Sequence, residues 1–565
     1  MSQIAIAPAR TLGTIDQKLF GGFVEHLGRC IYGGLYEEGS ALADQRGFRK
    51  DVLGLLRELR LGVLRWPGGN FVSNYHWADG IGEKASRPRR PELAWRGEEP
   101  NTFGTDEFLA YCAELGTQPY ICLNMGTGTL AEALDWVEYC NSARNTHWAA
   151  RRRANGRGDP YGVRYWALGN EMYGPWQVGM MTAEEYVREA TRWARAIRML
   201  DPEARLVACG ETGLTEWDRI VVDGLAGLVD YHSIHIYTGS DDYWTNVLQP
   251  HQAERAIKAT AALIDRAAYA QGLHPKPAIA YDEWNVWYRT VPGDENTVPS
   301  NPVPSSPVPS NPGAADLAEW YTFDDALAVA TYLNIFIRNC ARVRMANLAQ
   351  MVNAIAPIVT TADGAAVQPI YYPFLLHVRA ALDAAADVRV DGPTVSPELP
   401  PGASRWPHRI ADLGPFALVD AAASVSADQR KITVTLVNRG RDAADEAALV
   451  LRDFAFAGAA SVTTLTDAGP ALPGGAPGFP GTSALPGIAG AHLATSTVSA
   501  GPVASGTGAA RGHVLTLTLP PRSFTVVEAP IADRRSAPRL ARSRARFPDA
   551  RSPEKQRNKG VLPDE

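Results

Sequence analysis

Short apolar runs alternate with amphipathic stretches along most of the chain. Residues 63–66 and 119–124 are apolar runs that lead into Pro, Gly or Asn, a pattern typical of buried parallel strands. Residues 48–60 instead place Val52, Leu56 and Leu59 at helical spacing. The predicted strands are residues 23–26, 63–66, 119–124, 165–171, 205–209, 229–237, 278–285 and 344–351. With helices between them, these eight units favour an α/β fold, a closed (β/α)8 TIM barrel over residues 17–388.

Polar and apolar residues follow a different rhythm after about residue 390. Residues 431–438 and 514–519 alternate strictly, as half-buried strands do. We therefore expect an all-β sandwich, jelly-roll-like, over residues 389–532. Residues 1–16 contain a further strand, 3–6, which is expected to pack with that domain.

Two segments lack any such pattern. Residues 291–313 repeat Val-Pro-Ser, and proline removes backbone donors, so this loop after the seventh strand is either a tolerated insertion or a flap over the site. Residues 533–565 are rich in Arg, Ser and Pro, and we expect a disordered tail. Such a basic tail is usually solvated, although it can also contact nucleic acid or membrane.

Composition narrows the function classes. The 565 residues carry a net charge of −6, so neither nucleic acid nor an anionic membrane is an expected partner. The six cysteines form no C-x-x-C pair, which argues against a zinc ribbon or disulfide scaffold. Neither a signal peptide nor a membrane span is recognisable. These features together indicate a cytoplasmic protein.

Two acidic residues follow apolar runs of strand length. Glu171 ends the run before it in a Gly-Asn-Glu triplet, and Glu283 follows residues 278–281. In a barrel, the ends of such strands face the active site. A pair of carboxyl groups across a pocket suits glycoside hydrolysis, where one protonates the leaving oxygen and the other attacks the anomeric carbon or activates a water. Taken alone, either glutamate is more often a cap or a salt-bridge partner.

Several longer motifs carry a resemblance to glycoside hydrolase family 51, chiefly intracellular α-L-arabinofuranosidases. The motifs are GFVEHLGRCIYGG at 22–34, LRWPGGNF at 64–71, EPNTFGTDEF at 99–108, LGNEMYGPWQVG at 168–179 and DEWNVWY at 282–288. The resemblance implies a retaining mechanism with Glu171 as acid/base and Glu283 as nucleophile. It also implies no metal and no cofactor, and an assembly that is often hexameric.

The same resemblance assigns sugar contacts, all near predicted strand ends. They are Glu25, Asn70, Asn170, Tyr237 and Gln350, with Trp287 placed to stack on the sugar or the leaving chain. From the residues alone, Glu25 is equally a structural acid paired with Arg29 or Arg65. Arg65 ends the second strand, where it can hold Glu283 ionised. His235 is expected to point toward the site and His232 away from it, because the two lie on opposite faces of a regular strand.

The favoured function is exo-hydrolysis, which releases terminal non-reducing α-L-arabinofuranosyl units from arabinan- or arabinoxylan-derived oligosaccharides. An endoglucanase or β-xylosidase on the same barrel is the alternative enzyme. The non-enzyme alternative is a carbohydrate-binding protein with a vestigial barrel. Glu25, Asn70 and Gln350 together suit a small closed furanose site, whereas an endo-acting cleft needs a row of aromatic platforms.

Overall fold

The computed structural model describes most of the chain, namely residues 1–288, 317–404, 409–470, 489–499, 501–502 and 513–533. The Val-Pro-Ser loop 291–313 and the predicted tail from residue 534 onward lie outside the described residues. Within the described residues, no helix combines the length and the apolarity that a membrane crossing needs.

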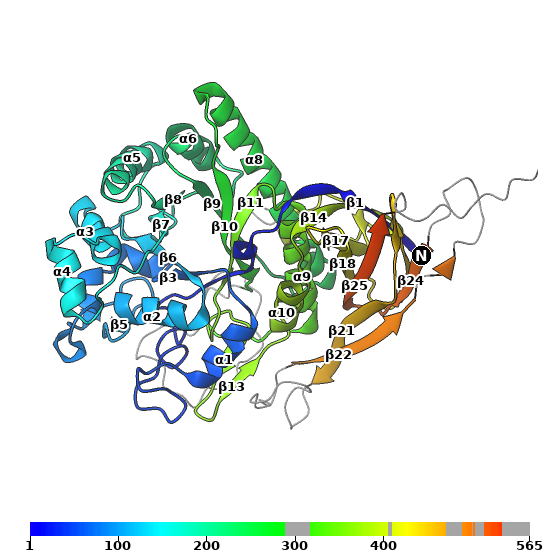
Figure 1. Ribbon diagram of the computed structural model, residues 1–565, viewed down its shortest axis with the longest axis horizontal. Helices are drawn as coiled ribbons and strands as arrows, with labels where there is room; N and C mark the ends of the chain where they lie inside the picture. Colours follow the sequence, from blue (N-terminus) through cyan, green and yellow to red (C-terminus); the bar gives the residue numbers. More distant parts are fainter. Residues whose placement is uncertain (289–316, 405–408, 471–488, 500, 503–512, 534–565) are drawn as a thin grey trace, which may run out of the picture.

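Eight parallel strands close into a barrel, each followed by a helix that covers its outer face (Figure 1). In chain order the strands are β2 (Gly21–Phe23), β3 (Val63–Trp66), β6 (Gln118–Leu123), β7 (Tyr165–Leu168), β8 (Arg205–Ala208), β9 (Tyr231–Thr238), β10 (Ala278–Val286) and β11 (Val343–Ala349). The helices are α1 (Lys50–Glu58), α2 (Thr105–Leu115), α3 (Leu130–Asn141), α5 (Ala183–Leu200), α6 (Glu216–Leu225), α8 (His251–Gln271), α9 (Phe323–Arg338) and α10 (Tyr371–Ala380). The predicted (β/α)8 barrel is confirmed.

Smaller elements decorate the loops between these units. Helices α4 (His147–Ala154) and α7 (Tyr243–Leu248) lie beside the barrel helices. Three short antiparallel pairs are β4 (Arg90–Pro91) with β5 (Glu98–Glu99), β12 (Ile358–Thr360) with β13 (Ala365–Val367), and β15 (Thr394–Val395) with β16 (Phe416–Ala417). The 3-10 turns are η1 (Gln17–Phe20), η2 (Asn70–Asn74), η3 (Trp77–Gly80), η4 (Lys84–Ser86) and η5 (Pro401–Ser404).

Two boundaries differ from the sequence prediction. The first barrel strand ends at Phe23 rather than at residue 26. The last barrel helix ends at Ala380 because Ala381 is already extended, and Ala384 begins strand β14 (Ala384–Asp391) within the range predicted for the barrel. Alanine-rich sequence is compatible with a helix, but here pairing with β1 (Ser2–Thr14) decides the conformation. The β domain therefore begins before the predicted boundary at residue 389.

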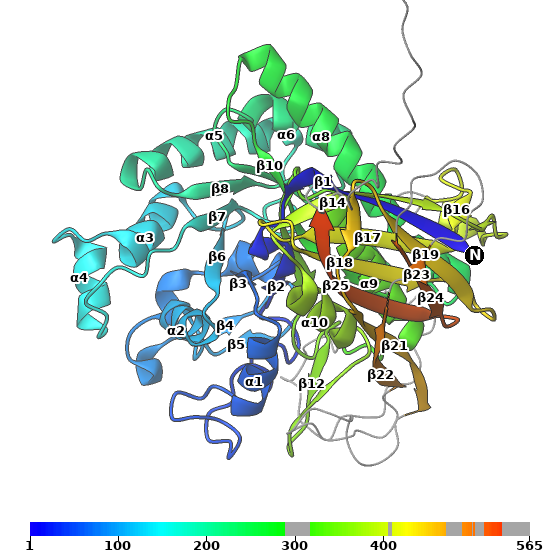
Figure 2. The same ribbon diagram turned by 45° about the vertical axis from the view of Figure 1, so that its right-hand side comes forward.

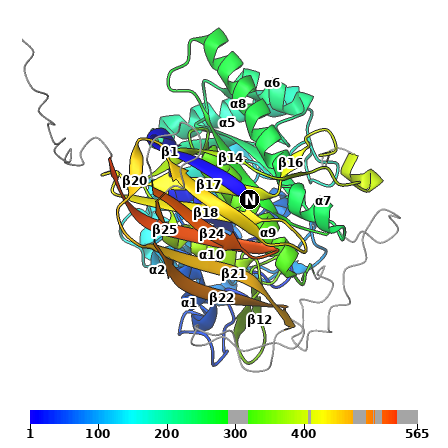
Figure 3. The ribbon, with the colours of Figure 1, turned by 90° about the vertical axis from the view of Figure 1, so that its right-hand side faces the viewer.

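The remaining strands form one continuous sheet (Figure 3). Along the sheet the order is β22 (Ala489–Val498), β21 (Ala460–Pro470), β25 (Ser523–Asp533), β18 (Lys431–Asn438), β17 (Val419–Val425), β14, β1, β19 (Asp445–Leu451), β24 (His513–Leu519) and β23 (Gly501–Pro502), with β20 (Phe454–Phe456) paired to β25. Strand β20 also contacts β24 and β19, so the sheet curls over a core that includes Ile4, Val434 and Leu517. The prediction of a β-rich domain after the barrel is confirmed.

Helices α9 and α10 lie between the barrel and the β domain (Figure 2). A polar cluster crosses this boundary. Asp420 of β17 accepts hydrogen bonds from Asn334 and Arg338 of α9, and Arg439 donates to Nε2 of His251 at 2.6 Å. These contacts hold the β domain against the barrel's outer helices, away from the barrel interior.

Acid is expected to weaken this boundary through His251. Burial, together with the adjacent Arg439 guanidinium, lowers the pKa of His251 to about 3, well below the 6.5 of an unfolded histidine. The unfolded chain therefore binds the extra proton first, and the stabilisation present above pH 6.5 is lost as the pH falls toward 3. We expect the melting temperature of His251→Gln to fall less between about pH 7 and about pH 5 than that of the wild type. His147→Gln, at an exposed histidine, is the matched control and should behave as the wild type.

Candidate active site

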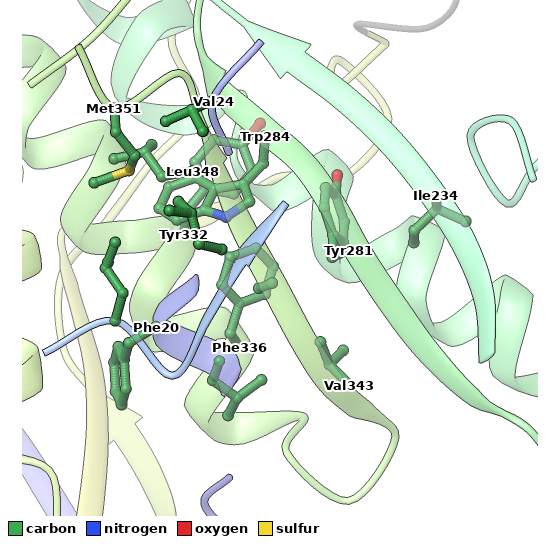
Figure 4. Packing of buried hydrophobic residues seen from close by; sticks show 14 of the residues in the cluster. Phe20, Val24, Ile234, Tyr281, Trp284, Tyr332, Phe336, Val343, Leu348 and Met351 are labelled. Atoms are coloured by element: carbon green, nitrogen blue, oxygen red, sulfur yellow. The ribbon is translucent and has the colours of Figure 1, made fainter. Parts of the chain in front are cut away.

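A bulge in strand β10 turns two neighbouring carboxylates into the barrel. Against both flanking strands the register slips by one residue, between Ala280 and Glu283 on the β9 side and between Tyr281 and Trp284 on the β11 side. Tyr281 and Trp284 therefore both face outward, where their rings pack at 5.1 to 5.2 Å from those of Phe336 and Tyr332 on α9 (Figure 4). Asp282 and Glu283 both face the interior, as bulges next to active sites often arrange.

Glu171 stands on a tight turn just beyond β7. Gly169 has φ of 78° and Glu171 itself has φ of 43°, a left-handed conformation that is costly for a residue with a side chain. Its Oε2 accepts a hydrogen bond from Trp176 Nε1 at 2.9 Å, and its Oε1 lies 3.1 Å from His235 Nδ1. The strained turn thus aims the Glu171 carboxyl across the barrel mouth toward β9 and β10.

Glu283 is buried among donors. Arg65 Nη1 lies 2.5 Å from its Oε1, and the Tyr237 hydroxyl donates to its Oε2 at 2.7 Å. The second Nη group of Arg65 donates to Asn170 Oδ1 at 2.7 Å. Burial alone lowers the pKa of Arg65, but the charges of Glu283 and Asp282 outweigh it and raise that pKa well above its usual value. The guanidinium thus stays charged beside Glu283, the contact expected from the sequence.

The two glutamates are neighbours in space although 112 residues apart in sequence. One carboxylate oxygen of Glu171, one of Glu283 and a ring nitrogen of His235 all lie within 4.8 Å of one another. Three such atoms are a possible ligand set for a metal ion. However, burial lowers the pKa of His235 less than the Glu283, Asp282 and Glu171 carboxylates raise it, to about 10. A protonated His235 offers no ring lone pair to a metal ion, and the Arg65 guanidinium adds a positive charge beside Glu283, so these contacts suit a proton better than a metal cation.

Glu25 forms a second wall of the same space. Its Oε1 accepts from the backbone N of Phe71 at 3.0 Å and from Trp95 Nε1 at 3.1 Å, and its Oε2 accepts from Gln350 Nε2 at 3.2 Å. Burial raises the pKa of Glu25 to about 8. A Cβ on Gly69 would meet Glu25 Oε2 at 2.3 Å, so the Pro-Gly-Gly turn is needed for the carboxyl to sit there. Neutral carboxyl and amide groups side by side can both donate to and accept from sugar hydroxyls.

The other residues predicted for the site lie around the same opening. Asn70 Oδ1 accepts from Asn170 Nδ2 at 3.4 Å. The Trp287 ring stands edge-on to Tyr237 with centroids 5.1 Å apart. His232, by contrast, points out of the barrel to Asp218 at 3.0 Å, as the strand alternation predicted.

The sequence patterns did not predict three residues that contribute to the site: Trp95, Trp176 and Asp282. Trp95 and Trp176 lie in loops, where no periodicity indicates direction, and each donates its indole N–H to a glutamate of the site. The position of Asp282 directly before Glu283 was a usable signal, but regular alternation would turn it outward.

Comparison with known proteins agrees with this geometry. A family model described as the alpha-L-arabinofuranosidase 1 domain matches residues 55–255, and one described as the alpha-L-arabinofuranosidase C-terminal domain matches residues 282–471. A probable alpha-L-arabinofuranosidase C of Aspergillus niger is 48% identical over 388 residues, which cover 66% of this chain and 73% of that protein. The intracellular exo-alpha-(1->5)-L-arabinofuranosidase 1 of Bacillus subtilis is 37% identical and covers 76% of this chain and 83% of that protein.

A solved structure extends the likeness to the whole fold. The thermostable GH51 alpha-L-arabinofuranosidase of Thermotoga petrophila superposes with a TM-score of 0.77 at 36% identity, over 94% of this chain and 100% of that one. These likenesses favour the predicted arabinofuranosidase over the endoglucanase, the β-xylosidase and the binding-protein alternatives. The chain belongs to glycoside hydrolase family 51 and is an α-L-arabinofuranosidase.

Proposed function

We propose that the enzyme releases terminal non-reducing α-L-arabinofuranosyl units with retention of anomeric configuration. The observation that carries this proposal is the closeness of the two carboxyl groups, whose nearest oxygens lie within 4.8 Å. Retaining glycosidases place their carboxyl groups about 5–5.5 Å apart, whereas inverting ones leave about 6.5–9.5 Å for an intervening water. The separation of Glu171 and Glu283 therefore matches the retaining geometry better than the inverting one.

The contacts of each glutamate support distinct roles. Glu283, beside Arg65 and Tyr237, is the carboxylate that attacks the anomeric carbon, while Glu171 delivers its proton to the glycosidic oxygen, which leaves with the electron pair of the broken bond. In the second step Glu171 takes a proton from water as that water attacks the same carbon. The bond to Glu283 breaks in the same step, as the bond to water forms, and its electron pair returns to the carboxylate. Water therefore enters on the face from which the leaving group departed.

The burial of the sugar-facing groups supports exo-action. Glu25, Asn170, Glu283 and Gln350 are each at most 5% exposed, so they suit one terminal furanose ring better than the middle of a chain. Trp176, which is 56% exposed and bonded to Glu171, lies where the leaving chain would emerge. We infer that the substrates are arabinan- or arabinoxylan-derived oligosaccharides. The name of the Bacillus subtilis relative, an exo-(1->5) enzyme, favours the arabinan-derived ones.

Methanolysis tests the stereochemical proposal. With 4-nitrophenyl α-L-arabinofuranoside and added methanol, we expect methyl α-L-arabinofuranoside, because methanol replaces water on the retained face. Proton NMR of the early products distinguishes the two anomers. Formation of the β-methyl glycoside would contradict the double displacement while leaving the arabinofuranosidase activity intact.

We also infer that the enzyme works in the cytoplasm as a homo-oligomer. The Bacillus subtilis relative is named as intracellular, and all six cysteines are buried free thiols, which suits a reducing compartment. The hexamer is an expectation from the family resemblance, and light scattering on the purified protein measures it.

A further inference from the structure

Asp282 is a buried carboxylate next to the catalytic pair that the two-step mechanism does not use. It is 1% exposed, and every oxygen has partners. Its Oδ1 accepts from the Ser233 hydroxyl and lies 3.2 Å from His235 Nε2. Its Oδ2 accepts from the Tyr120 hydroxyl at 2.7 Å and lies 3.7 Å from Arg65 Nε. Burying a charged carboxylate inside the barrel costs free energy of desolvation, so the presence of Asp282 at this position calls for a functional explanation.

His235 connects this carboxylate to the chemistry. Its Nε2 lies 3.1 Å from Ser233 Oγ and 3.2 Å from Asp282 Oδ1, while its Nδ1 lies 3.1 Å from Glu171 Oε1 and 3.6 Å from Glu283 Oε1. The titratable or charged groups in the same enclosure come from five strands or the turns after them: Glu171, Glu283, Asp282, Arg65, Tyr120 and Cys209, with the Ser233 hydroxyl beside the ring. Only Arg65 among these is cationic. With a carboxylate on either side of the ring, both nitrogens are suited to donate.

We propose that Asp282 is a positioning residue that holds His235 as an imidazolium, so that its Nδ1–H serves both catalytic carboxyl groups in turn. This inference rests on the proposed retaining mechanism. In the resting enzyme the negative charge resides on Glu283, and after glycosylation Glu283 is an ester and the charge resides on Glu171. Hydrolysis returns the charge to Glu283. A fixed cation within 3.6 Å of both oxygens stabilises either arrangement without moving.

The negative charge of Asp282 is the reason that aspartate is needed for this role. Burial raises the pKa of Asp282, but Arg65 and His235 outweigh it, so the net pKa lies below the usual value and the carboxylate stays ionised. Asparagine is nearly the same shape and retains an acceptor oxygen, yet it carries no charge. Asp282→Asn therefore removes the electrostatic support of the imidazolium while preserving the space that the side chain fills.

The first test compares pH profiles of Asp282→Asn and the wild type on 4-nitrophenyl α-L-arabinofuranoside. We expect the ratio of variant to wild-type kcat/KM to fall with pH, from about a tenfold loss near pH 5 to about a hundredfold loss near pH 9, as His235 loses its proton in the variant. A loss that is constant over this range would indicate a merely structural role and overturn the proposal.

Asp218→Asn is the matched control. Asp218 is a buried aspartate on α6 that pairs with His232 at 3.0 Å. His232 lies on β9, the strand that also carries His235, but it faces out of the barrel. Asp218→Asn should lower the melting temperature while its activity ratio to the wild type stays independent of pH. A sloping ratio in this control as well would show that any buried Asp–His pair produces the effect, and the proposal would fall.

A second measurement needs no folded variant of Asp282. Histidine side-chain ¹⁵N NMR of the wild type, with the His235 signals identified by their absence in His235→Gln, should show an imidazolium at about pH 8. A neutral ring at that pH overturns the proposal directly. Because this measurement involves no turnover, it is independent of the azide experiments on Glu171 and Glu283 described below. A failure of the catalytic assignment is thereby distinguishable from a failure of the Asp282 proposal.

Discussion

Replacing Glu283 with alanine is expected to lower kcat/KM for 4-nitrophenyl α-L-arabinofuranoside on the order of 10⁵-fold, because no covalent intermediate can form. Azide should restore part of the activity by entering the space that the carboxylate vacates. Since azide then attacks from the face opposite the leaving group, the product should be the β-arabinofuranosyl azide. Steady-state kinetics and NMR of the azide product provide the two readouts.

The control for this result is the folded state of the variant. Removing Glu283 leaves Arg65 with Asp282, 3.7 Å away, as its remaining carboxylate partner, so stability changes are expected. Glu283→Gln keeps a side chain that Tyr237 can reach, and its melting temperature should lie closer to the wild-type value. If Glu283→Gln retained wild-type turnover, Glu283 would not be the nucleophile.

Replacing Glu171 with alanine is expected to reduce kcat/KM, which reports the first step, about 10²–10⁴-fold for leaving groups that need a proton, and far less for 2,4-dinitrophenolate, which leaves unaided. The second step then lacks its base, so a glycosyl-enzyme should accumulate and appear as a burst of phenolate. Azide, which needs no base, should accelerate this step and give the α-arabinofuranosyl azide. Rapid-mixing kinetics with the two substrates check both expectations.

Trp176→Phe is the matched comparison for that variant. It removes the indole N–H that lies 2.9 Å from Glu171 Oε2, replaces the two-ring indole with a single ring, and keeps an aromatic side chain. Its loss of kcat/KM should be smaller than that of Glu171→Ala and should show the same dependence on the leaving group. If Glu171→Ala lost the same factor in kcat/KM on both substrates, proton donation by Glu171 would be excluded.

The local pattern of the chain was sufficient to predict the barrel. Short continuous apolar runs and amphipathic stretches of period 3.6 need no long-range information, because each must bury its apolar residues wherever it lies. The Gly-Asn-Glu triplet and the apolar run before Asp282 likewise placed Glu171 and Glu283 at strand ends. The family resemblance of the motifs added the identity of the sugar, arabinofuranose, and the roles of the two glutamates. The comparison with known proteins agrees on the sugar.

Long-range pairing decided what these local signals could not. The alanine-rich segment that follows α10 becomes β14 because β1, more than 360 residues earlier, offers hydrogen bonds. The bulge in β10 exists only against β9 and β11, and it alone turns Asp282 inward beside Glu283. Trp95 and Trp176 reach the glutamates from loops. Loop sequences have no repeating hydrophobic pattern from which the direction of a side chain can be predicted. The sequence by itself thus determined which strands form the barrel and which acids lie near their carboxyl ends, whereas the tertiary structure determined how those acids are charged, since charge depends on neighbours brought together from five separate strands.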